Sequence, residues 1–336
     1  MDMKMWLDNL KTAPQKKAMP VLSFPCISLL DITVKELIAD SDLQARGMKA
    51  IADRVNSAAS VSMMDLSVEA EAFGSSIRVS DDEVPTVVGS IITNEEEAEA
   101  LAVPSVGCGR TGKYIKAIGK AVELITDRPV FAGVIGPFSL AGRLMDVTEV
   151  LANCYDEPEM VHITMRKATA FIISYIQAYK EIGANGVVMA EPLTGLLSPN
   201  LAAEFSEPYV KQIIDAVQDD SFLVIYHNCG NSAVAIIDSI LRVGAAAYHF
   251  GNAISMKEML ALCPADTVVM GNIDPASQFC NGTPESVKEE TKRLMAECCN
   301  SHPNFVISSG CDIPPASPWR NIDSFFAAVE EFYSAV

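Results

Sequence analysis

The sequence has few positive charges and few histidines, and it lacks any long uninterrupted apolar stretch. Lys and Arg together number 25 against 43 Asp and Glu, which gives a formal net charge of −18. A chain of this charge is repelled by nucleic acid and by anionic membrane surfaces, so neither is expected as a partner. No apolar run reaches the roughly 18 residues that a membrane-spanning helix requires.

The beginning of the sequence also lacks the pattern of a secretion signal. The segment MDMKMWLDNLKTAPQKK is polar and mixed, without a basic region followed by an apolar one. The nine cysteines are odd in number and show no tight spacing typical of a disulfide framework. These features predict a cytoplasmic protein whose thiols are mostly reduced.

Several common catalytic signatures are missing. We find no serine–histidine–acid arrangement, no Walker phosphate loop and no HExxH zinc helix. GCGRTG at 107–112 matches a dinucleotide-binding pattern, but the proline-containing segment before it is a poor strand, so dinucleotide binding is not expected. Arg110 and Lys113 could contact an anion at a helix start, although a surface turn is the simpler expectation.

What the sequence does contain is a regular alternation of short apolar runs and amphipathic helical patterns. Runs buried on both sides are typical of a parallel sheet. The eight runs are residues 19–24, 60–66, 129–136, 185–191, 221–227, 245–250, 266–272 and 304–310. This alternation predicts an α/β fold, a (β/α)8 TIM barrel, with residues 1–336 forming one domain. A doubly wound open sheet is the competing interpretation.

The helical patterns carry recognisable start and stop signals. A long helix over 157–183 ends at Gly183, and further helices begin at Ser206 and at Thr283, each followed closely by a proline. A last helix spans 321–336, and its phenylalanines leave open a homo-oligomer interface. The stretch 81–128 reads as helix, loop and helix, and predicts a helical insertion between the second and third strands.

Polar and glycine-rich segments follow the predicted strands. Because the active sites of barrels lie at the carboxyl ends of the strands, these residues are expected to share one rim. Asp65 and Glu191 are the expected catalytic residues. The expected substrate-binding residues are Gly136, Pro137, Asn228, His249, Asn272 and Asp274.

A possible metal site lies on the same rim. His227 and Cys229 stand two residues apart at a strand end, so their side chains point the same way. Cys311 follows the last strand, and Glu191 is the candidate fourth ligand. One imidazole, two thiolates and an exchangeable position suit zinc. The simpler alternative is a buried cysteine beside a histidine with no metal role.

Several of these blocks resemble a known family. GPFSLAG, HNCGN, GNIDP and ISSGCDIPPASP, in that order, resemble the uroporphyrinogen decarboxylase superfamily, and more closely its methylcobamide:coenzyme M methyltransferase branch. The resemblance runs from about residue 20 to the end. H-x-C with a distant cysteine is typical of the zinc enzymes of the family. The arginines by which the decarboxylases bind their substrate are missing from LSFPCISLLDITVKEL, although Asp65 falls where those enzymes place a pocket aspartate.

The resemblance implies a Zn2+ cofactor at His227, Cys229 and Cys311, and a corrinoid (methylcobamide) carried by a partner protein. Zinc would lower the pKa of a thiol such as coenzyme M, and the thiolate would take the methyl group. Glycines at the rim, Gly136, Gly230 and Gly310, would let the flat corrinoid approach. The alternatives are an enzyme that loads the corrinoid from a methyl ether or methylamine, a decarboxylase of porphyrinogens, and a non-catalytic corrinoid-docking module.

Overall fold

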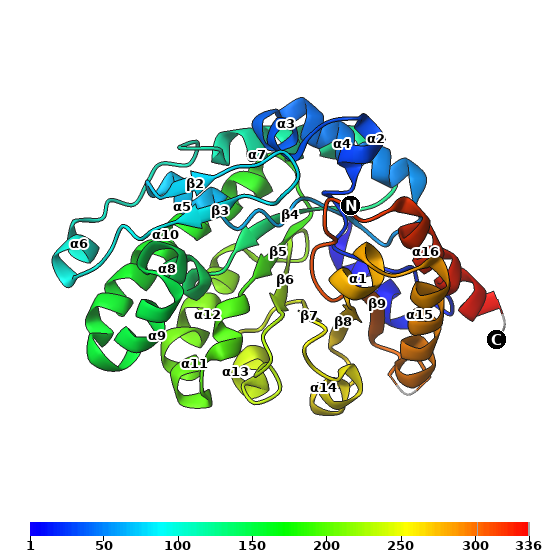
Figure 1. Ribbon diagram of the computed structural model, residues 1–336. Helices are drawn as coiled ribbons and strands as arrows, with labels where there is room; N and C mark the ends of the chain where they lie inside the picture. Colours follow the sequence, from blue (N-terminus) through cyan, green and yellow to red (C-terminus); the bar gives the residue numbers. More distant parts are fainter. Residues whose placement is uncertain (301, 335–336) are drawn as a thin grey trace.

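The computed structural model describes residues 1–300 and 302–334, and a curled parallel sheet ringed by helices forms its centre (Figure 1). Every neighbouring pair in this sheet is parallel. In spatial order the strands are β1 (Ser60–Val61), β4 (Val130–Ile135), β5 (Gly186–Ala190), β6 (Leu223–Asn228), β7 (Ala247–Phe250), β8 (Val268–Ile273) and β9 (Phe305–Ser309). The predicted α/β barrel fold is confirmed, and the strands alternate with helices as the apolar runs indicated.

The strand predicted at 19–24 is wrong, because this segment forms no regular ladder. Pro20 has no N–H to donate, which interrupts a ladder near the start of the segment. Residues 18–22, the closure segment, nevertheless fill the gap between β9 and β1. Met19 N donates to Ile307 O at 3.0 Å, and Ala58 N donates to Ala18 O at 2.8 Å. The run predicted at 60–66 is also shorter than expected, since only its first two residues form a strand.

The helices lie outside the sheet. They are α1 (Met3–Thr12), α2 (Cys26–Leu30), α3 (Val34–Ala39), α4 (Ser41–Arg54), α5 (Val68–Ala72), α6 (Glu95–Ala100), α7 (Thr111–Leu124), α8 (Pro137–Met145), α9 (Val147–Asp156), α10 (Pro158–Glu181), α11 (Pro199–Phe205), α12 (Glu207–Val217), α13 (Ile237–Arg242), α14 (Met256–Leu262), α15 (Pro284–Cys298) and α16 (Trp319–Ser334), with a 3-10 turn η1 (Pro192–Leu196) and a π turn η2 (Pro275–Cys280). The four predicted long helices are α10, α12, α15 and α16.

The caps of these helices agree with the sequence in part. Thr283 caps α15 in a reciprocal capping box with Ser286. Ser206 precedes α12, but its side chain makes no capping hydrogen bond to the described residues of this helix, so the cap predicted there is not formed. The predicted last helix extends to 336, but residues 335 and 336 lie outside the described part of the chain. Among the described residues, no helix combines the length and the apolar character that crossing a bilayer would require.

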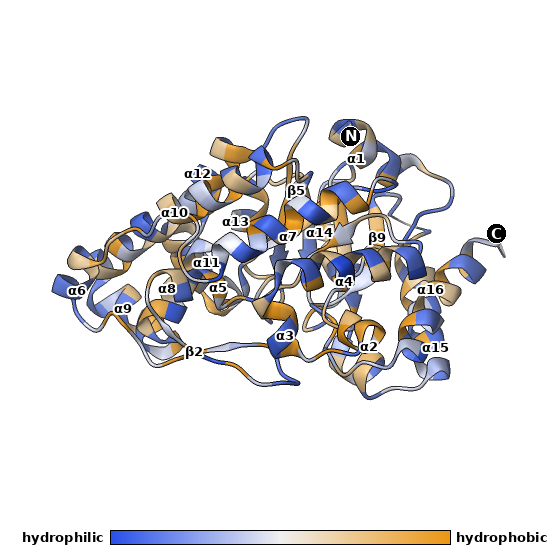
Figure 2. Ribbon diagram, turned by 90° about the horizontal axis from the view of Figure 1, so that it is seen from above, coloured by the Kyte–Doolittle hydropathy of each residue, from blue (hydrophilic) through white to orange (hydrophobic). Residues whose placement is uncertain are grey.

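The insertion between β1 and β4 contains the predicted helices as α6 and α7. It also contains an antiparallel hairpin of β2 (Ser76–Arg78) and β3 (Thr86–Val88) that was not predicted, because three-residue strands leave almost no periodicity. Helix α6 lies farthest from the strands, at the left of Figures 1 and 2. The outer helices carry apolar residues on one side and polar residues on the other (Figure 2).

Two apolar clusters hold the barrel together. One fills the space between the sheet and the helix ring, and the other fills the interior of the barrel. Helix α1 contributes Met3 and Leu10 to the interior cluster. Trp6 of the same helix packs on Phe131 with ring centroids 5.4 Å apart and donates its indole N–H to Ala58 O at 3.1 Å. Helix α1 therefore packs on the apolar interior, and the polar residues gather where the strands end.

Candidate functional site

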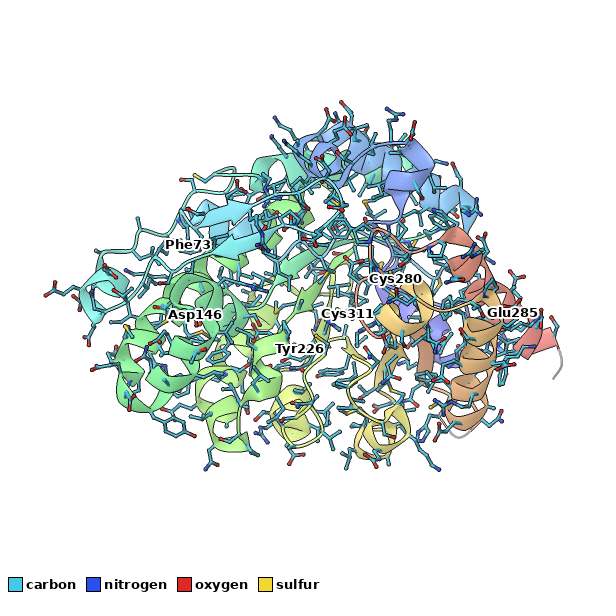
Figure 3. The ribbon with its side chains drawn as sticks, in the orientation of Figure 1. Phe73, Asp146, Tyr226, Cys280, Glu285 and Cys311 are labelled. Carbon is cyan, nitrogen blue, oxygen red and sulfur yellow. The ribbon has the colours of Figure 1, made fainter. Side chains whose placement is uncertain are left out.

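Three potential metal ligands converge at the carboxyl ends of β6 and β9. His227 is the second-to-last residue of β6, Cys229 follows that strand, and Cys311 lies two residues beyond β9. One ligand atom from each residue lies within 4.8 Å of the other two. Cys311 is labelled near the middle of the ring of strands in Figure 3. A tetrahedral zinc ion with bonds of about 2.0–2.3 Å holds its ligand atoms about 3.5–3.8 Å apart, so the three fit such an ion after small side-chain movements.

The two thiols lie close together, and this proximity separates their acidities. The neighbouring Cys311 thiol lowers the pKa of Cys229, while the neighbouring Cys229 and burial raise the pKa of Cys311. A thiolate at residue 229 is thus stabilised beside a protonated thiol at residue 311. Thiolate is the form of cysteine that binds metal ions.

The imidazole of His227 has one nitrogen that is free to bind. The side chain is 2% exposed, and the buried Nε2 has no hydrogen-bond partner among the described residues. Its other nitrogen, Nδ1, lies 2.7 Å from Nδ1 of His249. An unpartnered buried nitrogen costs folding free energy, and a metal ligand position accounts for it. This unpartnered nitrogen is the structural feature that best supports a metal ion at this position.

His249 lies on β7, directly opposite His227 in the parallel register. Its Nε2 lies 2.7 Å from the hydroxyl of Ser308, which in turn donates to Met19 O at 2.8 Å. Burial and the neighbouring His227 hold the pKa of His249 well below its ordinary value, so the ring is neutral. Both ring nitrogens of His249 contact protein groups. The sequence predicts instead that His249 lines the substrate pocket.

Glu191 is completely buried at the end of β5, yet it is not among the ligand atoms that converge within 4.8 Å. One carboxyl oxygen accepts from Ser139 N at 2.9 Å, and the other has no partner within the described part of the chain. Burial raises the pKa of Glu191 to about 8, so the carboxyl is mostly protonated at neutral pH. Gly136 faces this side chain, and a Cβ there would lie 2.0 Å from Glu191 Cγ.

Pro137 begins helix α8 directly after Gly136. Gly136, Gly230 and Gly310 were expected to leave room for a corrinoid. At each of them an added Cβ would instead meet another part of the protein within 3 Å. Gly230 packs on Gly195, and the Cβ of a substituted residue 310 would meet Asn252. These glycines allow close packing between neighbouring rim loops.

Asp65 is held in a buried ion pair. One carboxylate oxygen accepts from Arg110 and from the hydroxyl of Tyr114 at 2.6 Å, and the other accepts from Ser67. Arg110 also donates to Glu71 at 2.6 Å. The expectation that Arg110 occupies a surface turn is therefore wrong: the turn begins α7, and the guanidinium points inward to the end of β1.

Three other predicted substrate-binding residues make hydrogen bonds to nearby loops. Asn228 donates to Glu191 O at 3.0 Å, and Asn272 donates to Gly251 O at 2.9 Å. Asp274 accepts from the first backbone amides of η2. Each of these contacts shapes the rim.

Two buried carboxyl groups near the rim were not identified from the sequence. Glu69 accepts from Ile135 N at 3.0 Å through one oxygen, and burial raises its pKa to about 7. Asp312 accepts from Met64 N at 3.1 Å. Within residues 1–300 and 302–334, each of the two carboxyl groups has one buried oxygen without a hydrogen-bond partner. Asp312 follows Cys311 directly, so proximity to a predicted ligand was the available signal.

Comparisons with known proteins agree with this architecture. The model of the family described as "Uroporphyrinogen decarboxylase (URO-D)" matches residues 17–332. A methylcobamide:CoM methyltransferase, MtbA, of Methanosarcina mazei is 27% identical over 279 residues, which cover 80% of this chain and 78% of that protein. A uroporphyrinogen decarboxylase of Prochlorococcus marinus is 25% identical over 248 residues, covering 70% and 68%.

A solved structure of a methyltransferase from Methanosarcina mazei has the same fold. Its TM-score is 0.86 at 23% identity, and the alignment covers 99% of this chain and 98% of that one. A B12-independent methionine synthase from Shewanella follows with a TM-score of 0.61 at 13% identity, covering 96% and 97%. The chain thus belongs to the uroporphyrinogen decarboxylase (URO-D) family, and within that family it resembles the methylcobamide:CoM methyltransferases.

Proposed function

We propose that the protein is a zinc-dependent methyltransferase that moves a methyl group between a corrinoid on a partner protein and a thiol such as coenzyme M. The single observation that carries this proposal is the convergence of His227, Cys229 and Cys311 around a buried, unpartnered imidazole nitrogen. The likeness to the methylcobamide:CoM methyltransferases supports the corrinoid and the transferred methyl group.

The donor set suits zinc on grounds of charge. Two thiolates and a neutral imidazole balance the two positive charges of Zn2+, and a bound substrate thiolate leaves a net charge of −1. When bound, zinc lowers the pKa of a thiol so that a nucleophilic thiolate exists at neutral pH. Cys229 and Cys311 supply the negative charge, and His227 supplies the neutral ligand through Nε2.

Glu191 and Asp65 have different proposed tasks. Glu191 holds a proton in a buried site and has a free oxygen, so it is our candidate for delivering a proton. It is also our proposed fourth ligand, a role in which its side chain would have to move toward the ion and lose that proton. Asp65 has both oxygens bonded to protein donors. We therefore propose that it anchors the insertion through Arg110.

The direction of transfer defines a second candidate. In this version the enzyme loads the corrinoid from a methylated donor such as a methyl ether or methylamine. Loss of the methyl group from such a donor leaves a basic atom that must be protonated, and the neutral carboxyl of Glu191 favours this version. A thiol acceptor needs no such proton.

A metal-free decarboxylase is the alternative from another enzyme class. Binding a polycarboxylate requires free cationic side chains, and the segment from Leu22 to Leu37 contains no arginine. Arg110 is committed to Asp65 and Glu71. A non-catalytic corrinoid-docking module has no evident need for three converging ligands.

A metal analysis with matched cysteine variants tests the proposal. We expect about one zinc per chain in the purified protein, as for a single site of this kind. Cys311→Ser should lose the metal and the methyl transfer, whereas Cys280→Ser, a similarly half-buried thiol outside the ligand group, should keep both. Retention of zinc and full activity by Cys311→Ser would exclude the proposed site.

A second assay identifies the direction. Methyl transfer from free methylcobalamin to a panel of thiols is followed by the Co(I) absorbance, with metal content measured on the same sample. Transfer to any thiol supports the first version. No transfer to any thiol by a zinc-loaded sample supports loading of the corrinoid from a methylated donor.

The single domain over residues 1–336 and the homo-oligomer remain predictions.

A further inference from the structure

The two buried histidines and a serine form a chain of hydrogen bonds that ends on a backbone carbonyl. The chain runs from His227 to His249 at 2.7 Å, from His249 to Ser308 at 2.7 Å, and from Ser308 to Met19 O at 2.8 Å. The three side chains are at most 2% exposed, and the last acceptor belongs to the closure segment. We call these three side chains and the Met19 carbonyl the histidine relay.

The carbonyl fixes the direction of every bond in the relay. A carbonyl oxygen can only accept, so the single hydroxyl hydrogen of Ser308 is used on Met19 O. The Ser308 oxygen must then accept from Nε2–H of His249. A neutral imidazole carries one N–H, so Nδ1 of His249 is a lone pair. That lone pair can only accept from Nδ1–H of His227.

The consequence reaches the candidate metal centre. With its hydrogen on Nδ1, neutral His227 has its lone pair on Nε2, the buried nitrogen that has no partner. This is the nitrogen that is free to join Cys229 and Cys311, since Nδ1 is engaged by His249. The opposite tautomer would place a hydrogen where the ligand atom must be, and it would put two lone pairs in contact at 2.7 Å.

We propose that His249 and Ser308 are positioning residues that hold His227 in the Nδ1–H tautomer, with Nε2 prepared as a metal ligand. The inference rests on the proposed function for the identity of the ion, although the relay itself is a property of the protein alone. Partners of this kind fix the orientation of ligating histidines and typically change metal affinity by about 10–100-fold.

Chelator competition with zinc measures the effect on affinity. His249→Leu removes the acceptor for His227 and should weaken zinc binding by about 10–100-fold. His249→Asn retains an oxygen near the position of Nδ1 and should restore most of the affinity. Ser308→Ala keeps the imidazole but frees its tautomer, so a smaller loss of about 2–10-fold is expected, because only the competent tautomer binds.

Ser309→Ala is the matched control. Its hydroxyl is equally buried and accepts from Val21 N at 3.0 Å in the same closure segment, but it takes no part in the relay. Its zinc affinity should stay within about twofold of the parent. The absorption spectrum of the Co2+-substituted proteins adds a signature of the ligand field, which should change in His249→Leu and not in Ser309→Ala.

Imidazole 15N NMR on the metal-free, reduced protein reads the relay directly. The inference predicts a protonated Nδ1 on His227 and a protonated Nε2 on His249. The opposite tautomers would overturn it, even if the protein binds no metal and the proposed function fails. If the parent binds zinc while His249→Leu and Ser308→Ala bind it within twofold, the relay is overturned and the proposed function stands. Should His249→Leu fail to fold, the zinc affinity of Ser308→Ala and the NMR measurement still decide whether the relay sets the tautomer of His227.

Discussion

Replacing Glu191 with glutamine should change how the stability of the protein depends on pH. The carboxyl is completely buried, one oxygen accepts a single bond from Ser139 N, and the other has no partner. Burial raises the pKa of Glu191 from an ordinary 4.5 to about 8. The folded protein therefore holds this proton at pH values where the unfolded chain has released it.

The sign and size of the pH dependence follow from the difference between the pKa of Glu191 in the folded protein and in the unfolded chain. Because the folded pKa is the higher one, the contribution is fully present below about pH 4.5 and is lost as pH rises toward about 8. Each pH unit in this window lowers the free energy of unfolding by about 1.4 kcal/mol, and the whole window by about 5 kcal/mol. Glutamine has no proton to release, so Glu191→Gln should become increasingly more stable than the parent as pH rises.

Urea unfolding at several pH values, with chelator and reductant present, measures this difference. Between pH 5.5 and 7.5 the advantage of Glu191→Gln should grow by about 3 kcal/mol. Contributions of other buried groups, including Glu69, are common to both proteins and cancel. Glu123→Gln, which alters an exposed side chain of α7, should follow the parent curve in parallel. A constant difference between Glu191→Gln and the parent, within about 1 kcal/mol, would refute a neutral Glu191.

Two further substitutions test the packing of the rim. Arg110→Met leaves a buried carboxylate without its counter-charge and should lower the free energy of unfolding by about 3–5 kcal/mol in a urea titration. Arg166→Met removes one partner of an exposed ion pair and should lower the same free energy by only about 0–1 kcal/mol. Gly136→Ala forces a Cβ into Glu191 and should lower the free energy of unfolding by about 1–3 kcal/mol or more. Gly119→Ala, in helix α7, places a Cβ no closer than 3.6 Å to any described atom outside its own helix and should raise that free energy by about 0.5–1 kcal/mol. Equal shifts of the melting temperature for the two variants would contradict the close contact at Gly136.

The convergence of His227, Cys229 and Cys311 was predictable from the sequence because the placement of these residues follows from local rules. His227 and Cys229 are two residues apart at the end of a strongly apolar strand, and strand geometry alone puts both side chains on one side. Cys311 follows another such strand, and parallel strands in a barrel end at the same rim. Neither inference needs any knowledge of how the loops pack.

The remaining features depend on contacts between distant parts of the chain. Pro20 interrupts an apolar run that otherwise reads as a strand, and the segment keeps its place through only a few hydrogen bonds to β9 and β1. Arg110 lies in a glycine-rich turn that reads as exposed, and only its approach to Asp65 shows that it is buried. Ser308 has no sequence signal at all, since its role comes from His249 and Met19, 59 and 289 residues away.

The origin of the Met19 carbonyl has a consequence for the order of events during biosynthesis. Met19 and Ser308 are 289 positions apart, so the chain must be nearly complete before they can meet. Bringing such remote segments together has the largest entropic cost of loop closure, and contacts of this kind tend to form late in folding. A nascent chain that has already made β6 and β7 holds both imidazoles without the group that orients them. Maturation of the site around His227 is thereby coupled to completion of the whole ring.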